Sequence, residues 1–534
     1  MILLYNAKIY TQDPLIPFAT ALVIRHGIIT AIGTDQDILS EFSHIKNKID
    51  FRGKAVLPGF TDSHIHLGLY AQQLSKVDCE TKTKEICLAR VAEKAKNTPA
   101  GEWVLGHGWN QNVWESGYGT IDDLDRVAPN HPVYLTSKSI HAAWVNRQAF
   151  SKAGITEQTP DPEGGTFLKT SEGKLSGIIL EKAVLEIERV IPKPTPKMLA
   201  DLINNAQANL WKFGITGVHD FDDNNTFNAL QILEINDQLK LRVIKSIPFE
   251  YINERNRYNL RSGFGSSYMR IGSVKLFADG ALGPQTAAMM QPYSNDPSNV
   301  GMLLLDSKQI EEAGITAINS GLSLAIHAIG DRANHEALNA FDHIRKYELE
   351  HGEVPLNHRI EHAQILLDKD IKRFHELNIV ASVQPIHATS DMDMVDRYWG
   401  LERSAYAYPF QSLLNHKTTL TFGSDAPVES PNPFLGIHAA VTRQRTSSDI
   451  DNRTGWNPQE CISVHNAIAA YTRNPAIVAN LDSHLGKLLP GYDADLIACA
   501  QNPYQIDPSE LHHIYIHATM VGGQWVWDDG FLTK

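Results

Sequence analysis

Two histidines separated by one residue follow an apolar segment near the start of the chain. Residues 55–67 read AVLPGFTDSHIHL, with a Pro-Gly turn before the pair His64 and His66. If this segment is a strand, alternation points both imidazoles to one face and Ile65 to the other. Two neutral imidazoles on one face can bind a single metal ion. The alternative is that the two histidines occur together at a strand end by chance. The histidines and carboxylates later in the chain decide between a metal site and a chance pair.

Four further apolar segments end in a residue that can bind a metal. They read SVKLFADG, LSLAIHAIGD, HRIEHAQ and LTFGSDAPV, and the residues are Lys275, His327, His362 and Asp425. Each histidine alone is more often a satisfied core or loop residue, and Asp425 alone could cap the next helix. Together with the H-x-H pair, however, the four residues predict a metal site.

Lys275 is the least obvious of these residues. Alternation places it on one strand face with Phe277, and Val274 on the other. A lone buried ammonium is costly, and burial lowers the pKa of the amine. A neutral amine can take up carbon dioxide to form a carbamate, whose two oxygens can bridge two metal ions. A salt bridge to Asp279 or to another inward carboxylate is the alternative.

The segments that carry these residues predict a barrel. From residue 206 onward, apolar strands alternate with amphipathic helices, and with the first strand, AVLPGFTD, they number eight. This alternation indicates a parallel sheet, and eight units indicate an α/β fold of the (β/α)8, TIM-like class. The active sites of such barrels lie at the C-terminal ends of the strands. The candidate ligands follow those ends.

The two ends of the chain share short, β-branched segments that differ from the barrel pattern. Neither end alone has enough strands to bury a sheet face, so we expect residues 1–57 and 485–534 to form one small β-sandwich domain. Residues 58–484 would form the barrel, with an insertion at about 68–205 between its first and second strands. Tryptophans of this insertion, Trp109 among them, would either pack in its core or form an apolar wall for substrate.

Composition narrows the classes of partner. The chain has 534 residues and a formal net charge of −13, with no long run of Lys or Arg. This argues against nucleic acid and anionic membranes, and it leaves a small-molecule substrate as the expected partner. Four scattered cysteines, and an N-terminus without a basic leader, predict a cytoplasmic protein. A homodimer is compatible with these features.

The ordered motifs are similar to those of a known family. PGFTDSHIH resembles the first-strand metal motif of the amidohydrolase superfamily of metal-dependent hydrolases. VKLFADGALG, HAIGDRA, RIEHAQ and FGSDAPVESPNP resemble later motifs of the branch that includes N-substituted formamide deformylase and YtcJ-like amidohydrolases. GHGWNQNVW, IHAAWVNRQAF and LGKLLPGYDADL also fit this branch, so the likeness spans nearly the whole chain.

The resemblance implies a role for each candidate. It implies that the more buried metal is bound by His64 and His66, the second by His327 and His362, with carbamylated Lys275 bridging and Asp425 as both ligand and proton shuttle. It further implies that His141 and His387 lie on the substrate side. Zinc suits this ligand set best, as one or two ions, with iron, manganese, cobalt and nickel as alternatives.

The function implied is hydrolysis of a carbon–nitrogen bond outside peptides, in an amide or N-substituted formamide. Metal-bound hydroxide would attack the carbonyl carbon, which the metal or the catalytic candidate His141 would polarise, and Asp425 would carry the proton to the leaving nitrogen. An esterase, lactonase or cyclic amidase using the same centre is one alternative. A non-catalytic regulatory protein that retains the fold is another, which a missing ligand would favour.

Overall fold

The computed structural model describes residues 1–115, 117–139, 141–252, 260–446 and 455–533. These residues form two compact units. The first contains Met1–Tyr70 and Ile203–Lys534, and the second contains Ala71–Leu202. The domain boundaries expected from the sequence stay a prediction, although the second unit overlaps the expected insertion. Among the described residues, no helix has the length and apolar character that crossing a membrane requires.

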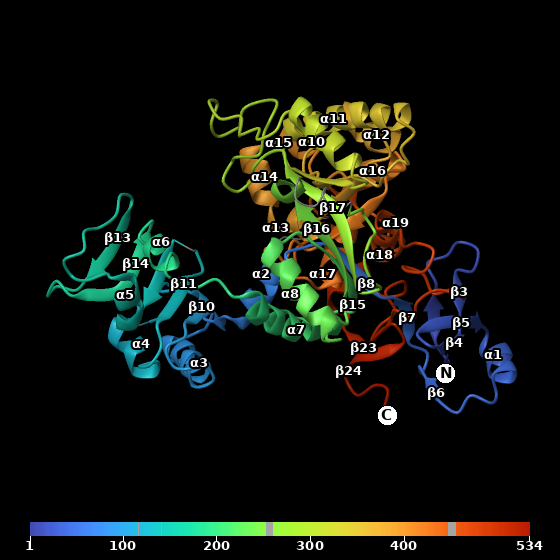
Figure 1. Cartoon of the computed structure of the whole chain (residues 1–534), viewed down its shortest axis with the longest axis horizontal. Helices are drawn as coiled ribbons and strands as arrows, with labels where there is room; N and C mark the ends of the chain where they lie inside the picture. Colours follow the sequence, from blue (N-terminus) through green and yellow to red (C-terminus); the bar gives the residue numbers. More distant parts are fainter. Residues whose placement is uncertain (116, 140, 253–259, 447–454, 534) are drawn as a thin grey trace. The chain divides into compact units, whose positions relative to one another are not determined.

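Eight parallel strands form the centre of the first unit (Figure 1). In spatial order they are β8 (Phe60–Ile65), β15 (Ile215–Asp220), β16 (Arg242–Pro248), β17 (Met269–Phe277), β18 (Leu324–Ala328), β19 (Arg359–His362), β20 (Val380–Val383) and β21 (Leu420–Phe422). The first and last strands also meet, because Asp425 N donates to His64 O and His66 N donates to Ala426 O. The sheet therefore closes, which confirms the predicted TIM-like barrel.

Among the described residues, helices lie between most successive strands of the barrel or follow its last strand. They include α7 (Pro196–Lys212), α8 (Asn224–Ile235), α10 (Ser307–Ile318), α11 (Asp331–Glu350), α12 (Asp368–Glu376), α16 (Phe410–Asn415), α17 (Pro433–Thr442), α18 (Val464–Tyr471) and α19 (Arg473–Val478). Side chains cap their first turns: Asp223 accepts from two amides of α8, and Asp306 forms a capping box with Gln309 in α10. Strands such as β15 and β19 are buried at every position, as expected for a parallel sheet covered on both faces.

Strands from both chain ends share one sheet. Its order is β24 (Gln524–Asp528), β23 (Ile516–Val521), β22 (Leu496–Cys499), β7 (Ala55–Pro58), β2 (Lys8–Tyr10) and β3 (Phe18–Ala19). A second sheet contains β5 (Ile28–Gly33), β4 (Ala21–Arg25), β1 (Ile2–Tyr5) and β6 (Lys48–Asp50). One hydrophobic cluster joins residues of both sheets, including Leu4, Val56 and Leu496. The antiparallel pairing of β7 with β22 thus connects the two ends of the chain.

The second unit has its own six-stranded sheet. Its order is β13 (Gly165–Lys169), β14 (Leu175–Glu181), β12 (Ala142–Val145), β11 (Val133–Ser137), β10 (Val104–Trp109) and β9 (Val77–Asp78). The helices of this unit include α3 (Lys84–Lys96), α4 (Ile121–Val127), α5 (Arg147–Ala153) and α6 (Val184–Glu188). Trp109 is fully buried in its core, where Nε1 donates to Leu135 O over 2.7 Å.

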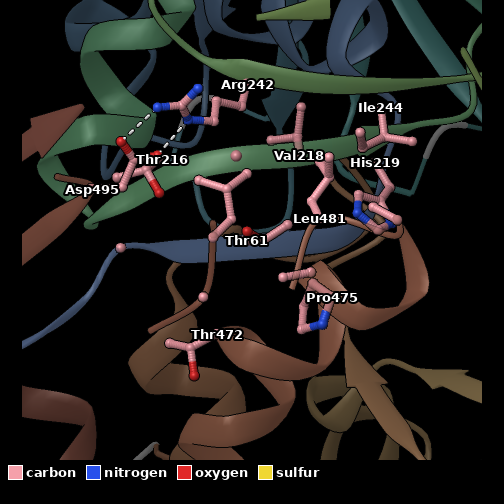
Figure 2. Close-up of a pocket in the computed structure, with 16 residues that line it drawn as sticks. Thr61, Thr216, Val218, His219, Arg242, Ile244, Thr472, Pro475, Leu481 and Asp495 are labelled. Carbon is pink, nitrogen blue, oxygen red and sulfur yellow. Dashed lines mark hydrogen bonds and ion pairs between the residues drawn. The ribbon is translucent and has the colours of Figure 1, made fainter. Parts of the chain in front are cut away.

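A small cavity of about 40 Å³ lies near the N-terminal ends of the barrel strands (Figure 2). Thr61, Thr216 and Val218 line it near the starts of β8 and β15. Beside them Arg242 binds Asp495 through two hydrogen bonds, Nε to Oδ2 at 2.5 Å and Nη2 to Oδ1 at 2.9 Å. Asp495 directly precedes β22, so this ion pair connects the barrel to the C-terminal segment.

Candidate metal centre

The opposite ends of the strands surround a larger cavity, of about 390 Å³. The side chains that line it include all six predicted metal ligands and one further predicted residue: His64, His66, Lys275, His327, His362, Asp425 and His387. These residues come from four barrel strands and from the segments that follow β8, β20 and β21. The barrel therefore brings together residues that are up to 361 positions apart, since the set runs from 64 to 425.

The H-x-H pair faces the cavity as the alternation predicted. His64 Nε2 lies 3.6 Å from Asp425 Oδ1, and His66 Nε2 lies 3.4 Å from the same oxygen. The other ring nitrogens contact carboxylates: His64 Nδ1 lies 2.6 Å from Glu361 Oε2, and His66 Nδ1 lies 3.0 Å from Asp222 Oδ1. A carboxylate on Nδ1 leaves Nε2 free for a metal ion, which is the usual arrangement around metal-binding histidines.

Glu361 is a site residue that the sequence did not reveal. It is fully buried, and Arg359 donates to both of its carboxylate oxygens. Burial alone would raise the pKa of Glu361, but Arg359 and His64 hold it well below its ordinary value. Glu361 is therefore ionised where it contacts His64. Its position one residue before His362 in the RIEHAQ motif was the only signal available.

His362 reaches the cavity through an unusual backbone. Arg359 and Glu361 point inward from β19, so plain alternation would turn His362 away. Its φ of 73° breaks the alternation, and Asp425 likewise has a φ of 58°. Non-glycine residues in this region are uncommon and cluster at functional sites. His362 Nδ1 lies 2.8 Å from Gln384 Oε1, which leaves its Nε2 free.

Two sets of three side chains have ligand atoms within 4.8 Å of one another. One set is His64, His66 and Asp425, and the other is His362, His387 and Asp425. His387 is 7% exposed, and neither of its ring nitrogens has a hydrogen-bond partner among the described residues. Asp425 belongs to both sets and is therefore placed between two groups of imidazoles.

His327 lies beside these sets without belonging to either. Its ring centroid is 4.5 Å from that of His362, but its Nε2 contacts Gly280 O at 2.8 Å. Nδ1 is then the nitrogen left for a metal. The assignment of His327 as a ligand of a second ion stays a prediction, and His387 is the histidine that the geometry adds.

The ionisation of these groups suits a divalent ion. Burial lowers the pKa of His64 to about 4 and that of His327 to about 3, so both rings are neutral and able to bind a metal. Burial alone would raise the pKa of Asp425, but His66 and His64 hold it well below its ordinary value. Burial alone would lower the pKa of His66, but Asp222 and Asp425 raise it to about 10, so this ring must lose a proton when it binds a metal ion. Neutral imidazoles around an ionised carboxylate are the ligand set that divalent transition metals prefer, so the residues fit such an ion.

Lys275 is buried at 4% exposure, with Nζ 4.5 Å from the ring centroid of Phe221 and 5.1 Å from that of Phe277. Burial lowers its pKa to about 8. Within the described chain, Asp279 does not pair with Lys275. Its carboxylate accepts from three backbone amides, those of Ala288, Ile329 and Gly330. Among the described residues Lys275 forms no salt bridge with Asp279 or with another carboxylate, and the carbamate stays a prediction.

The two remaining predicted residues lie in the second unit. His141 is exposed, and its Nδ1 lies 3.0 Å from Glu181 Oε2. Trp109 is buried and stacks with Trp114 at a centroid distance of 6.3 Å. This is core packing, one of the two interpretations that the sequence allowed. Roles for His141 and Trp109 toward the substrate stay predictions.

Comparisons with known proteins agree with this site. Residues 48–527 match the amidohydrolase family. YtcJ of Bacillus subtilis, whose name describes it as an amidohydrolase, is 32% identical over 95% of this chain and 96% of its own. N-substituted formamide deformylase of Arthrobacter pascens is 25% identical over 98% of this chain and 97% of its own. A crystal structure of an uncharacterized metal-dependent hydrolase from Pyrococcus furiosus is 30% identical, with a TM-score of 0.77 over 94% of this chain and 99% of that one.

Proposed function

Because this chain belongs to the amidohydrolase family, whose members hydrolyse carbon–nitrogen bonds, we propose that it cleaves a non-peptide amide or an N-substituted formamide at a metal centre. The observation that carries the proposal is the position of Asp425 Oδ1 between His64 Nε2 and His66 Nε2, within reach of the second histidine group as well. A carboxylate in this position can bind a metal ion and can accept and donate a proton.

His64, His66 and Asp425 would hold the first ion, for which zinc is our first choice. A second ion would take His362 with His327 or His387, and Lys275, as its carbamate, would supply the bridging oxygens. Such ions, when bound, polarise a carbonyl oxygen and lower the pKa of water. The lowered pKa of Lys275 supports the carbamate, because only the neutral amine reacts with carbon dioxide.

Asp425 would act as the proton shuttle. Its carboxylate is ionised, so an Oδ atom can accept a proton from the attacking water. The protonated carboxyl can then donate to the leaving nitrogen, because the two steps need opposite protonation states. If His387 does not bind the second ion, it would donate a hydrogen bond to the substrate's carbonyl oxygen; its burial and its lack of a hydrogen-bond partner among the described residues support this role.

The alternatives share the same cavity. Hydrolysis of an ester, a lactone or a cyclic amide would use the same residues, and a non-catalytic protein would have no need of them. All six predicted ligands line the cavity, which supports catalysis. The likeness to N-substituted formamide deformylase favours the formamide.

Incubation of the metal-loaded protein with three substrate classes tests the proposal. N-substituted formamides, simple lactones and N-acyl amino acids would be compared at equal concentration, with product amine or acid as the readout. We expect formamides or simple amides to be cleaved fastest. Faster hydrolysis of lactones would favour the esterase alternative, and no turnover of any class would favour the non-catalytic one.

We further propose that the two terminal sheets make up a small β-sandwich domain. The cluster that joins Leu4 and Leu22 of one sheet to Val56, Leu496 and Met520 of the other supports this arrangement. Face-to-face sheets of a sandwich share such an apolar layer.

A further inference from the structure

The cavity has an apolar wall beyond the candidate ligands. Phe277 and Val428 are 50% and 67% exposed, although both line the cavity. Leu282, Ile329 and Met394 complete this wall. Large apolar side chains that remain accessible inside a cavity offer contact area to the apolar part of a ligand.

Three polar residues that line the same cavity outside the candidate ligand set offer hydrogen-bond acceptors. Glu429 is partly buried and has no hydrogen bond or salt bridge among the described residues, and Asp391 has only the Tyr408 hydroxyl, 2.6 Å away, on its Oδ2. Gln364 is 3% exposed, and its Oε1 has no partner in the described structure. A buried acceptor without a partner is costly, so a ligand that brings donors would be stabilised here.

Cations are scarce around this wall. Among the described residues that line the cavity, Lys275 is the only lysine or arginine, and it lies within the candidate ligand set. A substrate arm that ends in a carboxylate would therefore meet Glu429 and Asp391 without a compensating cation. An arm that ends in an ammonium group would have carboxylate and amide oxygens available along this lining, and charge-assisted hydrogen bonds of this kind are the stronger ones.

We propose that the substrate is an amide with an apolar arm that ends in a positively charged amine, and that Glu429 selects this amine. The proposal rests on the proposed amide hydrolysis and adds the charge of the substrate to it. Glu429 lies four residues after Asp425 on the segment that follows β21, with Val428 between them. The apolar part of the arm would contact Phe277 and Val428, and the amine would reach Glu429 beyond them.

The test uses three formamides whose N-substituents have equal length and end in an ammonium, a methyl or a carboxylate group. We expect kcat/KM to fall in that order, with the ammonium compound favoured over the methyl compound by about 10-fold, the lower end for a hydrogen bond to a charged group. High salt should reduce this ratio, because it screens charges near solvent. A wild-type preference for the carboxylate compound would overturn the proposal.

Variants locate the preference on Glu429. Glu429→Gln should bring the ammonium-to-methyl ratio close to one, and Glu429→Lys should shift the preference to the carboxylate compound. Glu402→Gln is the matched control, because Glu402 is exposed on α15 (Leu401–Ser404) and does not line the cavity. An unchanged ratio in Glu429→Gln would remove Glu429 from substrate selection.

A binding measurement separates failure of this inference from failure of the proposed function. If none of the three formamides is cleaved, their dissociation constants for the metal-loaded protein are measured by calorimetry. Preference for the ammonium compound that is lost in Glu429→Gln would retain the charge selection and reject amide hydrolysis. Cleavage of all three compounds at equal efficiency would retain amide hydrolysis and reject the charge selection.

Discussion

Glu361 Oε2 lies 2.6 Å from His64 Nδ1, although the two residues are 297 positions apart in the sequence. This contact sets the tautomer of His64 and directs its Nε2 toward Asp425. Arg359 in turn holds Glu361, so the orientation of a candidate ligand depends on two charged residues inside the barrel.

The first prediction follows from this contact. Glu361→Gln keeps the shape of the side chain but removes its charge, so metal affinity should fall about 10- to 100-fold. Competition with a chelator measures this. Glu348→Gln is the matched control, because Glu348 forms a similar buried pair with His358 outside the cavity, 3.2 Å from its Nε2. Equal metal affinity in wild type and Glu361→Gln would contradict the role of Glu361.

The second prediction concerns the H-x-H pair. His64→Ala and His66→Ala should each greatly reduce metal content and activity, because each removes an imidazole whose Nε2 faces Asp425. Elemental analysis of the purified variants measures the metal. His343→Ala, at an exposed histidine on α11, is the control. Full metal content in both variants would place the ion elsewhere.

The third prediction concerns the proton shuttle. Asp425→Asn removes the basic carboxylate, so turnover should fall by about 10²- to 10⁴-fold. Some metal should remain, since the histidines are unchanged. Steady-state kinetics with parallel metal analysis separates the two effects. Near-normal turnover would transfer the shuttle role to another group, with His387 the next candidate.

The fourth prediction concerns Lys275. Lys275→Ala should lose activity, and formate or propionate should restore part of it by filling the space of the carbamate. Bicarbonate should help to reactivate metal-stripped wild-type protein and should have no effect on Lys275→Ala. A fully active protein whose Lys275 carries no carbon dioxide by mass spectrometry would exclude the carbamate.

The fifth prediction concerns the far end of the barrel. Arg242→Met leaves Asp495 buried without its partner, so the free energy of unfolding should fall by about 3–5 kcal/mol. Urea denaturation measures this. Arg189→Met, at an exposed ion pair, should change it by no more than about 0.5 kcal/mol. We expect this end of the barrel to stabilise the fold without contributing to the metal centre. A lower metal affinity in folded Arg242→Met than in wild type would contradict this.

The sequence by itself determined the family, the barrel and six candidate residues at the ends of its strands. Alternation placed His64 and His66 on one face, and it placed Lys275 with Phe277, because strand geometry depends only on neighbours in the chain. The ordered motifs predicted the family that the comparisons confirm. Strand ends of a parallel barrel meet at one end, so polar residues at those ends could be assigned to a common cavity before any contact was known.

Only the tertiary structure decided how those residues are held. The φ of 73° at His362 reverses the alternation of β19, which a sequence pattern does not encode. Glu361 and Asp222 contact the H-x-H pair across long separations in the chain. His387 is buried, and within the described part of the chain its ring nitrogens have no hydrogen-bond partner, because of what packs around it. Tautomer, pKa and ligand direction are set by such distant neighbours, since electrostatic contacts depend on proximity in space and not along the chain.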